Sequence, residues 1–310
     1  MTAVTDTCAS ITQSPAFEPR LASLSVGLST LADKPEETAA STLRALWALA
    51  SGQSASAELA QGLTLPELDD AGLARLDALL SRRLAGEPLA HLTGRQHFMG
   101  LELLAGPQAL IPRRETEILA QAALGKLREL AAASAQPVNV IDVCTGCGNL
   151  ALALAFHEPR ARVQASDLSA DAVELAGRNA QHLGLGDRVE WHCGDFLAPF
   201  HTEGAPGSVD LLVCNPPYIS SGKLKTMPDE IIAREPSLAF DGGPFGIRML
   251  QRLMREAPEH LRSGGWLAFE VGLGQGAAAQ QWLGKMSEFD TIESAVDAEG
   301  QVRAVLARRR

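Results

Sequence analysis

The segment Asn215-Pro216-Pro217-Tyr218 has the residue types of a site that binds a planar amino group. Two consecutive prolines fix the backbone and donate no N–H, so the chain here is rigid and offers carbonyl acceptors. The Asn215 side chain adds another acceptor, and Tyr218, the only tyrosine in the sequence, adds a flat ring. Two acceptors beside an aromatic plane suit the NH2 group of an amide or a nucleobase. A proline-rich turn without chemistry is the alternative, because a motif is a hypothesis until its context confirms it.

A second group of candidate residues lies between an apolar run at 138–143 and a helical pattern at 150–157. Glycines there let the backbone approach a ligand closely, and the start of a helix presents free N–H groups. Asp167 follows about 20 residues later, where an acidic group can hold ribose hydroxyls. The same glycine spacing fits a dinucleotide fingerprint, so a NAD-linked oxidoreductase remains an alternative. The candidates for cofactor binding in this loop are Asp142, Cys144, Thr145, Gly146, Cys147 and Gly148.

Three further features favour S-adenosylmethionine as the cofactor. Asp142 brings a carboxylate towards the ligand, which suits a cationic sulfonium better than a pyrophosphate. Asp195 and Phe196 follow the next apolar run, where they offer an acceptor for an adenine amino group and a ring beside the base. Asn215 follows yet another strand at the same expected edge of the sheet, where ligands of α/β proteins bind. A turn aspartate and a core phenylalanine are the alternative for Asp195 and Phe196.

Alternating strand and helix patterns position these residues. The alternation predicts an α/β fold, a Rossmann-like, doubly wound and mostly parallel sheet covered by helices. Expected helices occupy 150–157 and, after a Ser169 cap, the segment up to Gly184. The expected strands lie at 138–143, 163–166, 189–193, 209–214, 266–271, 292–296 and 302–306.

The chain before about residue 90 is rich in alanine and leucine with helical spacing. One helix is expected to begin near Pro35, and another at the capping pattern Thr64-x-x-Glu67. Between residues 88 and 112, glycines and prolines alternate with apolar residues, which indicates a short β connector. The expected domains are an N-terminal helical domain at 1–87, with 1–16 disordered, the connector at 88–112 and a catalytic domain at 113–310.

Composition narrows the class of protein. The chain has 310 residues, 46% of them apolar and 21% charged, which is ordinary for a globular protein. No stretch approaches the length of a membrane-spanning helix, and the N-terminus lacks the pattern of a targeting peptide, so we expect a cytoplasmic protein without membrane partners. The net charge of −10 argues against stable binding of long nucleic acid, which usually requires a basic face.

The cysteines leave two minor alternatives open. Cys144-x-x-Cys147 precedes a helix, a position that lowers a thiol pKa, so a thiol oxidoreductase is one alternative. Cys193 and Cys214 end predicted strands and would gather at the same edge, which makes a zinc site the other. They lack the spacing of a second ligand pair, and the seven histidines form no spaced cluster, so we expect no metal.

The sequence resembles the release-factor glutamine (N5) methyltransferase family, within the class I S-adenosylmethionine-dependent methyltransferases. The resemblance extends from about residue 84 to residue 303, and its most specific part is the segment 111–117. The Asn-Pro-Pro-Tyr motif also marks adenine-N6 and some RNA methyltransferases. The matching motifs are Ala85-Gly-Glu87-Pro88-Leu, Ile111-Pro-Arg-Arg-Glu-Thr-Glu117, the glycine loop, Asp167, Asn179-Ala, Asn215-Pro-Pro-Tyr218, Arg234-Glu-Pro236, Gly264-Gly265 and Glu270-Val-Gly272.

The resemblance implies an N-terminal helical domain that docks the protein substrate, a peptide-chain release factor, whose Gly-Gly-Gln glutamine is methylated by the C-terminal catalytic domain. We expect a monomer. The resemblance places Thr145, Gly146 and Gly148 in the cofactor loop. It also places Asp167 on the ribose and Phe196 beside the adenine. The catalytic residues that it implies, which hold the glutamine, are Asn215, Pro216, Pro217 and Tyr218.

Four positions depart from the family pattern. Cys144 replaces a usual glycine, Cys147 a usual threonine or serine, and Arg114 a common proline. Phe245 lies in a stretch that lacks the aspartate often found there. The alternatives are therefore a paralogue acting on another amide or amine, an adenine-N6 or guanine-N2 nucleic-acid methyltransferase, and a non-catalytic interaction protein with the same fold.

Overall fold

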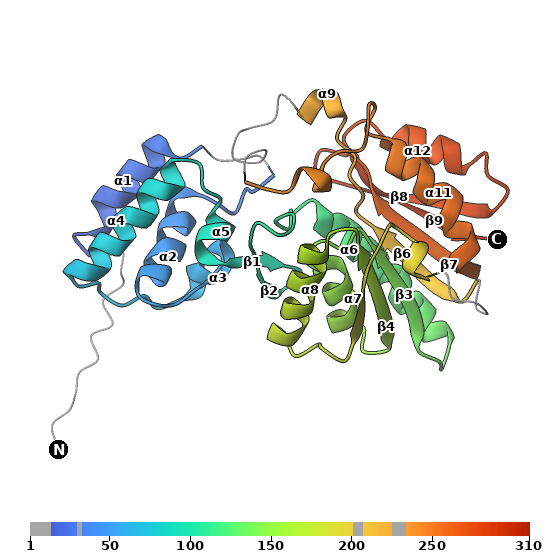
Figure 1. Cartoon of the computed structure of the whole chain (residues 1–310), viewed down its shortest axis with the longest axis horizontal. Helices are drawn as coiled ribbons and strands as arrows, with labels where there is room; N and C mark the ends of the chain where they lie inside the picture. The colour runs from blue at the N-terminus through green and yellow to red at the C-terminus, as the bar shows by residue number, and fades with distance from the viewer. Residues whose placement is uncertain (1–13, 30–32, 201–206, 225–233) are drawn as a thin grey trace, which may run out of the picture. The chain divides into compact units, whose positions relative to one another are not determined.

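The structure is a computed structural model that describes residues 14–29, 33–200, 207–224 and 234–310 (Figure 1). The chain divides into two compact units, Met1–His97 and Phe98–Arg310. The expected disorder of residues 1–16 falls largely outside the described residues.

Unit 1 is a set of helices around a core that contains Trp47 and Leu43, both fully buried. Trp47 donates its indole N–H to the Pro66 carbonyl at 2.8 Å, which holds the segment before the last long helix in place. The helix expected at Thr64 begins later, because Asp69 caps it by accepting the Gly72 N–H at 2.7 Å. The start predicted at Thr64 was therefore wrong. The described helices are α1 (Phe17–Gly27), α2 (Ala39–Ala50), α3 (Ala57–Gly62), α4 (Asp70–Leu84) and α5 (Leu89–Thr93).

The division between the units falls within a short strand, β1 (Arg95–Phe98), which pairs with β2 (Leu101–Leu104). Unit 2 then alternates helices and strands, as expected. Its remaining elements are α6 (Thr116–Ala133), β3 (Val138–Val143), α7 (Asn149–His157), β4 (Ala161–Asp167), α8 (Ala170–His182), β5 (Val189–Cys193), η2 (Ala198–Phe200), β6 (Val209–Cys214), α9 (Ser221–Leu224), η3 (Ser237–Ala239), α11 (Arg248–His260), β7 (Leu261–Glu270), α12 (Gly276–Leu283), β8 (Phe289–Val296) and β9 (Val302–Arg309).

Within the described part of unit 2, seven strands form one sheet in the order β5-β4-β3-β6-β7-β9-β8. The first five of these run parallel, and β9 is antiparallel to both of its neighbours. The chain moves outwards from β3 to β5 and then returns to place β6 on the other side of β3. This reversal is a topological switch point, where α/β proteins bind ligands at the carboxyl ends of the strands.

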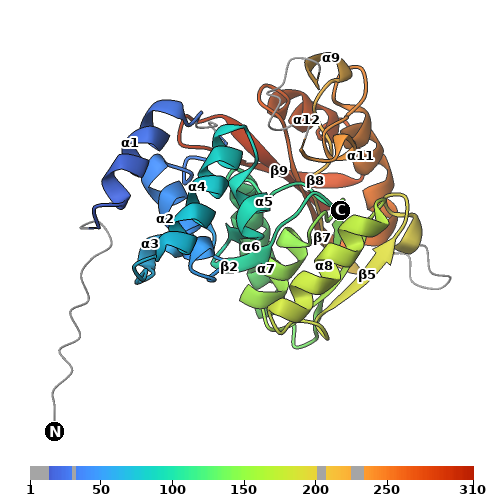
Figure 2. The same ribbon diagram turned by 60° about the vertical axis from the view of Figure 1, so that its left-hand side comes forward.

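Helices cover both faces of this sheet (Figures 1 and 2). Val138 and Val140 of β3 belong to the core under α6, α7 and α8, whereas Ile141 and Val143 belong to the core under α11 and α12. This alternation follows from the two-residue period of a strand. The doubly wound, mostly parallel α/β fold is confirmed.

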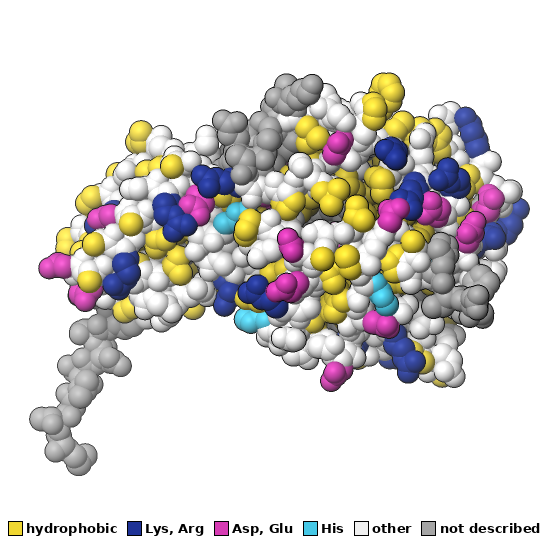
Figure 3. Space-filling model, viewed as in Figure 1, with side chains coloured by type: hydrophobic (Ala, Val, Ile, Leu, Met, Phe, Trp, Pro, Cys, Tyr) yellow, Lys and Arg dark blue, Asp and Glu magenta, His cyan; other side chains and the backbone are white. Residues whose placement is uncertain are grey.

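No helix of the described residues is both long enough and apolar enough to cross a membrane. On the face drawn in Figure 3, hydrophobic, acidic and basic side chains of the described residues are interspersed, and the basic ones do not form a continuous groove.

Candidate active site

A cavity of about 570 Å³ opens at the carboxyl edge of the sheet, beside the switch point between β3 and β6. Its volume is in the usual range for cofactor and ligand sites. Residues from loops after four parallel strands line it together with parts of α8 and α11. Six of the residues proposed from the sequence are among them: Cys144, Asp167, Asp195, Phe196, Asn215 and Pro217.

The other proposed residues lie next to this lining and are not part of it. They are Asp142, Thr145, Gly146, Cys147, Gly148, Pro216 and Tyr218. Several of them hold the lining residues in place.

Asp142 is fully buried beneath the loop that follows β3. Its Oδ2 accepts the Thr145 hydroxyl at 2.6 Å and the Ala151 N–H at 3.2 Å, so it ties the loop to the first turn of α7. Its Oδ1 has no hydrogen-bond partner. Burial raises the pKa of Asp142 to about 7, because a charged carboxylate is poorly solvated there. An unpartnered carboxylate oxygen under the cofactor loop suits a nearby cationic ligand.

Asp167, at the end of β4, is fixed by the loops on either side of it. Its Oδ2 accepts the Gly146 N–H and its Oδ1 accepts the Ser169 N–H, both at 2.9 Å. Burial raises its pKa, and these backbone hydrogen bonds oppose that rise. The carboxylate therefore faces the cavity in a defined orientation and keeps lone pairs available for hydroxyl donors.

Three residues at the site have a left-handed backbone conformation. Cys144 and Phe196 both have φ of +59°, in the left-handed region that side chains rarely adopt. A glycine at position 144 would adopt this conformation without strain. Gly148, at φ +85°, is required by packing, because a Cβ there would lie 2.8 Å from the Trp191 ring.

Asp195 has a partner within the protein. Arg252 of α11 pairs with Asp195 at 2.7 Å, and its guanidinium lies 4.8 Å from the centre of the Phe196 ring. Because Asp195 is exposed, this ion pair contributes little to stability, but it orients both the carboxylate and the ring. Sequence reasoning did not single out Arg252, since nothing local relates it to residues more than fifty positions earlier.

A chain of hydrogen bonds fixes the Asn-Pro-Pro-Tyr motif. Asn215 donates its Nδ2 hydrogen to the Thr116 hydroxyl oxygen at 3.1 Å, which leaves its Oδ1 as the acceptor. Tyr218 donates its hydroxyl to Glu270 Oε1 at 2.9 Å, and the Thr116 hydroxyl is near enough to the Glu270 carboxylate to lower its pKa. Thr116 and Glu270 are each only 1% exposed. Both lie in motifs that carried the family resemblance, but no local sequence pattern pairs them with Asn215.

Burial governs the protonation of Glu270 and Tyr218. It raises the pKa of Glu270, and hydrogen bonds from Thr116 and Tyr218 act in the opposite direction. Burial and the neighbouring Glu270 carboxylate raise the pKa of Tyr218 well above its ordinary value. Tyr218 therefore keeps its proton and remains a donor near neutral pH.

A buried ion pair joins two other segments that resemble the family. Arg113 pairs with Glu235 at 2.5 Å, and the same carboxylate accepts the Ile111 N–H at 2.9 Å. A buried pair of this kind adds little net stability, because the cost of desolvating the two charges offsets their attraction. Here the pair holds the segment directly before helix α6, whose first residue is Thr116.

The cysteines are free thiols in the described residues. Burial raises the pKa of Cys147 to about 12, so the expectation that its position before a helix would lower its pKa was wrong. Cys144 and Cys214 lie at the carboxyl ends of the neighbouring strands β3 and β6, as expected for residues at the same edge of the sheet. No group of three or more potential ligands among the described residues is placed to hold a metal ion.

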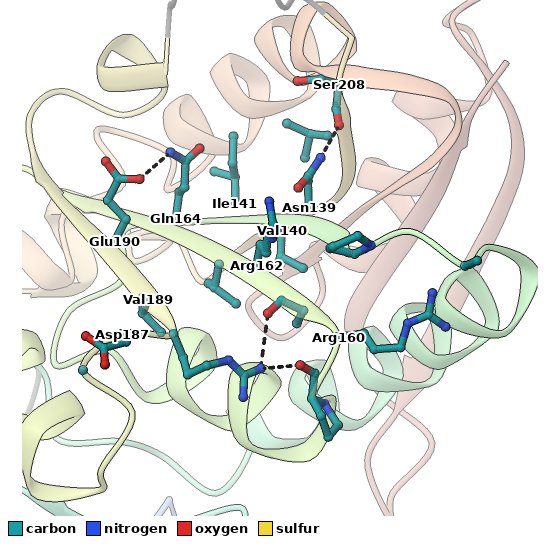
Figure 4. Close-up of a pocket in the computed structure, with 18 residues that line it drawn as sticks. Asn139, Val140, Ile141, Arg160, Arg162, Gln164, Asp187, Val189, Glu190 and Ser208 are labelled. Atoms are coloured by element: carbon teal, nitrogen blue, oxygen red, sulfur yellow. Dashed lines mark hydrogen bonds between the residues drawn. The ribbon is translucent and has the colours of Figure 1, made fainter.

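A larger cavity of about 950 Å³ lies at the opposite edge of the sheet (Figure 4). Several of its polar side chains make structural contacts. Asn139 donates to the Ser208 carbonyl at 3.3 Å, and Gln164 donates to Glu190 at 3.0 Å. Arg188 donates to backbone carbonyls at the end of α7 and beyond it. This edge therefore lacks a convergent set of reactive groups, and the candidate active site remains the carboxyl edge.

Comparison with known proteins identifies the family. The PrmC N-terminal domain model matches residues 24–94, and the methyltransferase small domain model matches residues 126–247. The release factor glutamine methyltransferase of Moorella thermoacetica is 40% identical over 244 residues, which cover 79% of this chain and 83% of that protein. The chain belongs to the release factor glutamine methyltransferase family.

Two other similar proteins add detail. The ribosomal protein uL3 glutamine methyltransferase of Bradyrhizobium diazoefficiens is 36% identical over 207 residues, 66% of this chain and 63% of that protein. The N-terminal domain of human METTL16 in complex with SAH superposes with a TM-score of 0.50 at 16% identity. The matched region covers 73% of this chain and 82% of the METTL16 chain. At this identity, the similarity shows the fold alone.

Family membership confirms three predictions made from the sequence: the family itself, the methyltransferase class and the use of S-adenosylmethionine. The cavity fits this cofactor. Asp167 offers a carboxylate, Phe196 a ring and Asp142 an unpartnered oxygen below the loop.

Proposed function

We propose that this enzyme methylates the side-chain amide nitrogen of the glutamine in the Gly-Gly-Gln motif of a peptide-chain release factor. The observation that carries the proposal is the family match across both parts of the chain, together with Asn215 at the cavity of the methyltransferase fold. Residues 1–87 are proposed to dock the release factor. We expect the enzyme to act as a cytoplasmic monomer.

S-adenosylmethionine supplies a methyl group that is activated by a sulfonium. Asp167 is proposed to accept hydrogen bonds from the ribose, and Phe196 to lie beside the adenine. Asp195 keeps one carboxylate oxygen free of Arg252 in the described contacts and is proposed to accept from the adenine amino group. The loop 144–148 is proposed to enclose the remainder of the cofactor, with Asp142 beneath it.

Asn215 is proposed to hold the reacting nitrogen. Its Nδ2 hydrogen is engaged by Thr116, so its Oδ1 is available to accept one substrate N–H. The carbonyl of Pro216 is proposed to accept the other N–H. We propose that the ring of Tyr218 lies along the amide plane, while its hydroxyl is anchored on Glu270.

Placement is proposed to account for most of the catalysis. An amide nitrogen is a poor nucleophile, because its lone pair is delocalised into the carbonyl group. Holding both N–H groups turns the nitrogen towards the methyl group, and such orientation can contribute several kcal/mol. Fixed acceptors also stabilise the positive charge that develops on nitrogen. The proton leaves after methyl transfer, so no side chain must act as a general base.

Replacing Asn215 with alanine is expected to lower kcat about 100-fold while the affinity for S-adenosylmethionine changes little. The reason is that the proposed contact is made to the reacting group. Steady-state kinetics with saturating release factor, combined with calorimetric titration of the cofactor, measure both quantities. Near-normal turnover would remove Asn215 from the mechanism.

A methyl-transfer assay with four acceptors tests the proposal. Labelled S-adenosylmethionine is offered with release factor, with its Gly-Gly-Gln→Gly-Gly-Ala variant, with ribosomal protein uL3 and with DNA. The proposal predicts label on the intact release factor alone. Label on uL3 would favour the acceptor named for the Bradyrhizobium relative, and label on DNA would favour a nucleic-acid methyltransferase.

A further inference from the structure

Two loops that pack against Tyr218 carry exposed apolar side chains. Phe245 is 79% exposed and Leu273 is 64% exposed. Two other exposed leucines of unit 2, Leu168 and Leu238, line the site cavity and are accounted for by it. Phe245 and Leu273 lie outside the cavity lining and have no such explanation.

The loop that carries Phe245 is held tightly to the catalytic motif. Gly242 donates its N–H to the Ile219 carbonyl at 2.8 Å. At Gly246, with φ of +70°, a Cβ would lie only 2.2 Å from the Tyr218 carbonyl oxygen. The backbone on both sides of Phe245 therefore packs against the segment that contains Tyr218. These contacts hold the loop in place, while the Phe245 ring is exposed.

The loop that carries Leu273 also packs against Tyr218. At Gly272, a Cβ would lie 2.9 Å from Cδ2 of Tyr218. Gln275 accepts the Gly272 N–H at 2.9 Å and donates to the carbonyls of Tyr218 at 3.2 Å and Gly246 at 3.1 Å. One glutamine side chain thus links both loops to the catalytic tyrosine.

We propose that Phe245 and Leu273, together called the Phe245–Leu273 surface, form a docking surface for the polypeptide acceptor next to its target residue. The occupant is a protein segment with apolar side chains next to the methylated amide. Both loops pack against Tyr218, which belongs to the motif proposed to hold that amide, so a polypeptide bound at the motif has these two side chains among its nearest exposed apolar neighbours. The inference rests on the proposed function and adds where its protein substrate is held.

The chemistry of the surface favours a polypeptide over a nucleic acid. Neither side chain offers a positive charge for a phosphate, and phosphate contacts dominate the affinity of nucleic-acid binding. Single exposed apolar residues are common on proteins and carry no meaning alone. These two differ because rigid loops hold them beside the reacting group, so little conformational entropy is lost when a partner covers them.

The test compares three single variants in the methylation of purified release factor. Phe245→Ser and Leu273→Ser remove the proposed contacts, and Phe156→Ser is the matched control. Phe156 is 49% exposed at the end of α7, which is outside the site lining. The proposal predicts that each of the first two variants raises KM for the release factor about tenfold, as the loss of a partly buried apolar contact should. kcat and cofactor affinity should stay within about twofold of the wild-type values, and the thermal midpoint should stay within a few degrees of the wild type.

The outcomes separate this inference from the proposed function. Unchanged KM in both variants, with normal methylation by the wild type, would overturn the docking surface and leave the proposed function intact. An equal rise of KM in Phe156→Ser would also overturn it, because the effect would then be a general one. A wild-type enzyme that labels no release factor would overturn the proposed function first, and the docking surface with it.

Discussion

Replacing Thr116 with valine removes one hydroxyl and keeps the shape of the side chain. The hydroxyl accepts from Asn215 at 3.1 Å, and Thr116 is 1% exposed. Its loss leaves the Asn215 Nδ2 hydrogen without its acceptor at a partly buried position, which should cost about 1–3 kcal/mol of unfolding free energy. It also frees the Asn215 amide to rotate. Losing an orienting hydrogen bond worth about 1.4 kcal/mol in the transition state would lower kcat about tenfold.

Two further variants isolate the catalytic part of this effect. Thr93→Val removes another buried hydroxyl, which donates to the Leu89 carbonyl at 3.0 Å, and should cost stability without changing kcat. Thr116→Ser keeps the hydroxyl and should recover most of the turnover. The assay measures kcat with saturating acceptor, cofactor affinity by calorimetry and stability by urea denaturation. A Thr116→Val enzyme with wild-type kcat would refute the view that this hydroxyl orients Asn215.

Two more predictions concern the cofactor loop. Asp142→Asn should stabilise the folded protein at about pH 8 and much less at about pH 4, as denaturation curves across this range would measure. Burial raises the pKa of Asp142 from 3.8 to about 7, so the native state retains a proton that the unfolded chain releases, and wild-type stability falls as pH rises through this window. Cys144→Gly should raise the unfolding free energy by about 0.5–1 kcal/mol, because it relieves a left-handed conformation at the expense of chain entropy. A loss of stability in the glycine variant would contradict that explanation.

Much of the sheet could be predicted because its signals are local. Four consecutive apolar residues at 211–214, directly before Asn215, with a strand–helix alternation upstream, indicate a buried parallel strand whose carboxyl end meets the others. The positions of Asp167 and Asn215 at one edge follow from that topology. The helix at Thr64 was predicted wrongly because two capping patterns compete there. Asp69 caps the helix, while the Pro66 carbonyl is used by Trp47.

The contacts that orient the site could not be predicted, because they join residues far apart in the sequence. Thr116 is separated from Asn215 by 99 residues, and Glu270 is separated from Tyr218 by 52. A carboxylate within a strand also does not reveal its own burial. Asp142 was expected to face the ligand, whereas one of its oxygens braces the loop from below. Pairings of this kind depend on the folded geometry, which a single sequence does not specify locally.

The central claim is that Asn215 presents the glutamine of a release factor for methyl transfer. The most direct measurement is fragment-ion mass spectrometry of release factor after reaction with S-adenosylmethionine and either wild-type enzyme or the Asn215→Ala variant. We predict one added methyl group on the side chain of the Gly-Gly-Gln glutamine with the wild type, and almost none with the variant at equal times. A methyl group on any other residue, or equal methylation by both enzymes, would contradict the account.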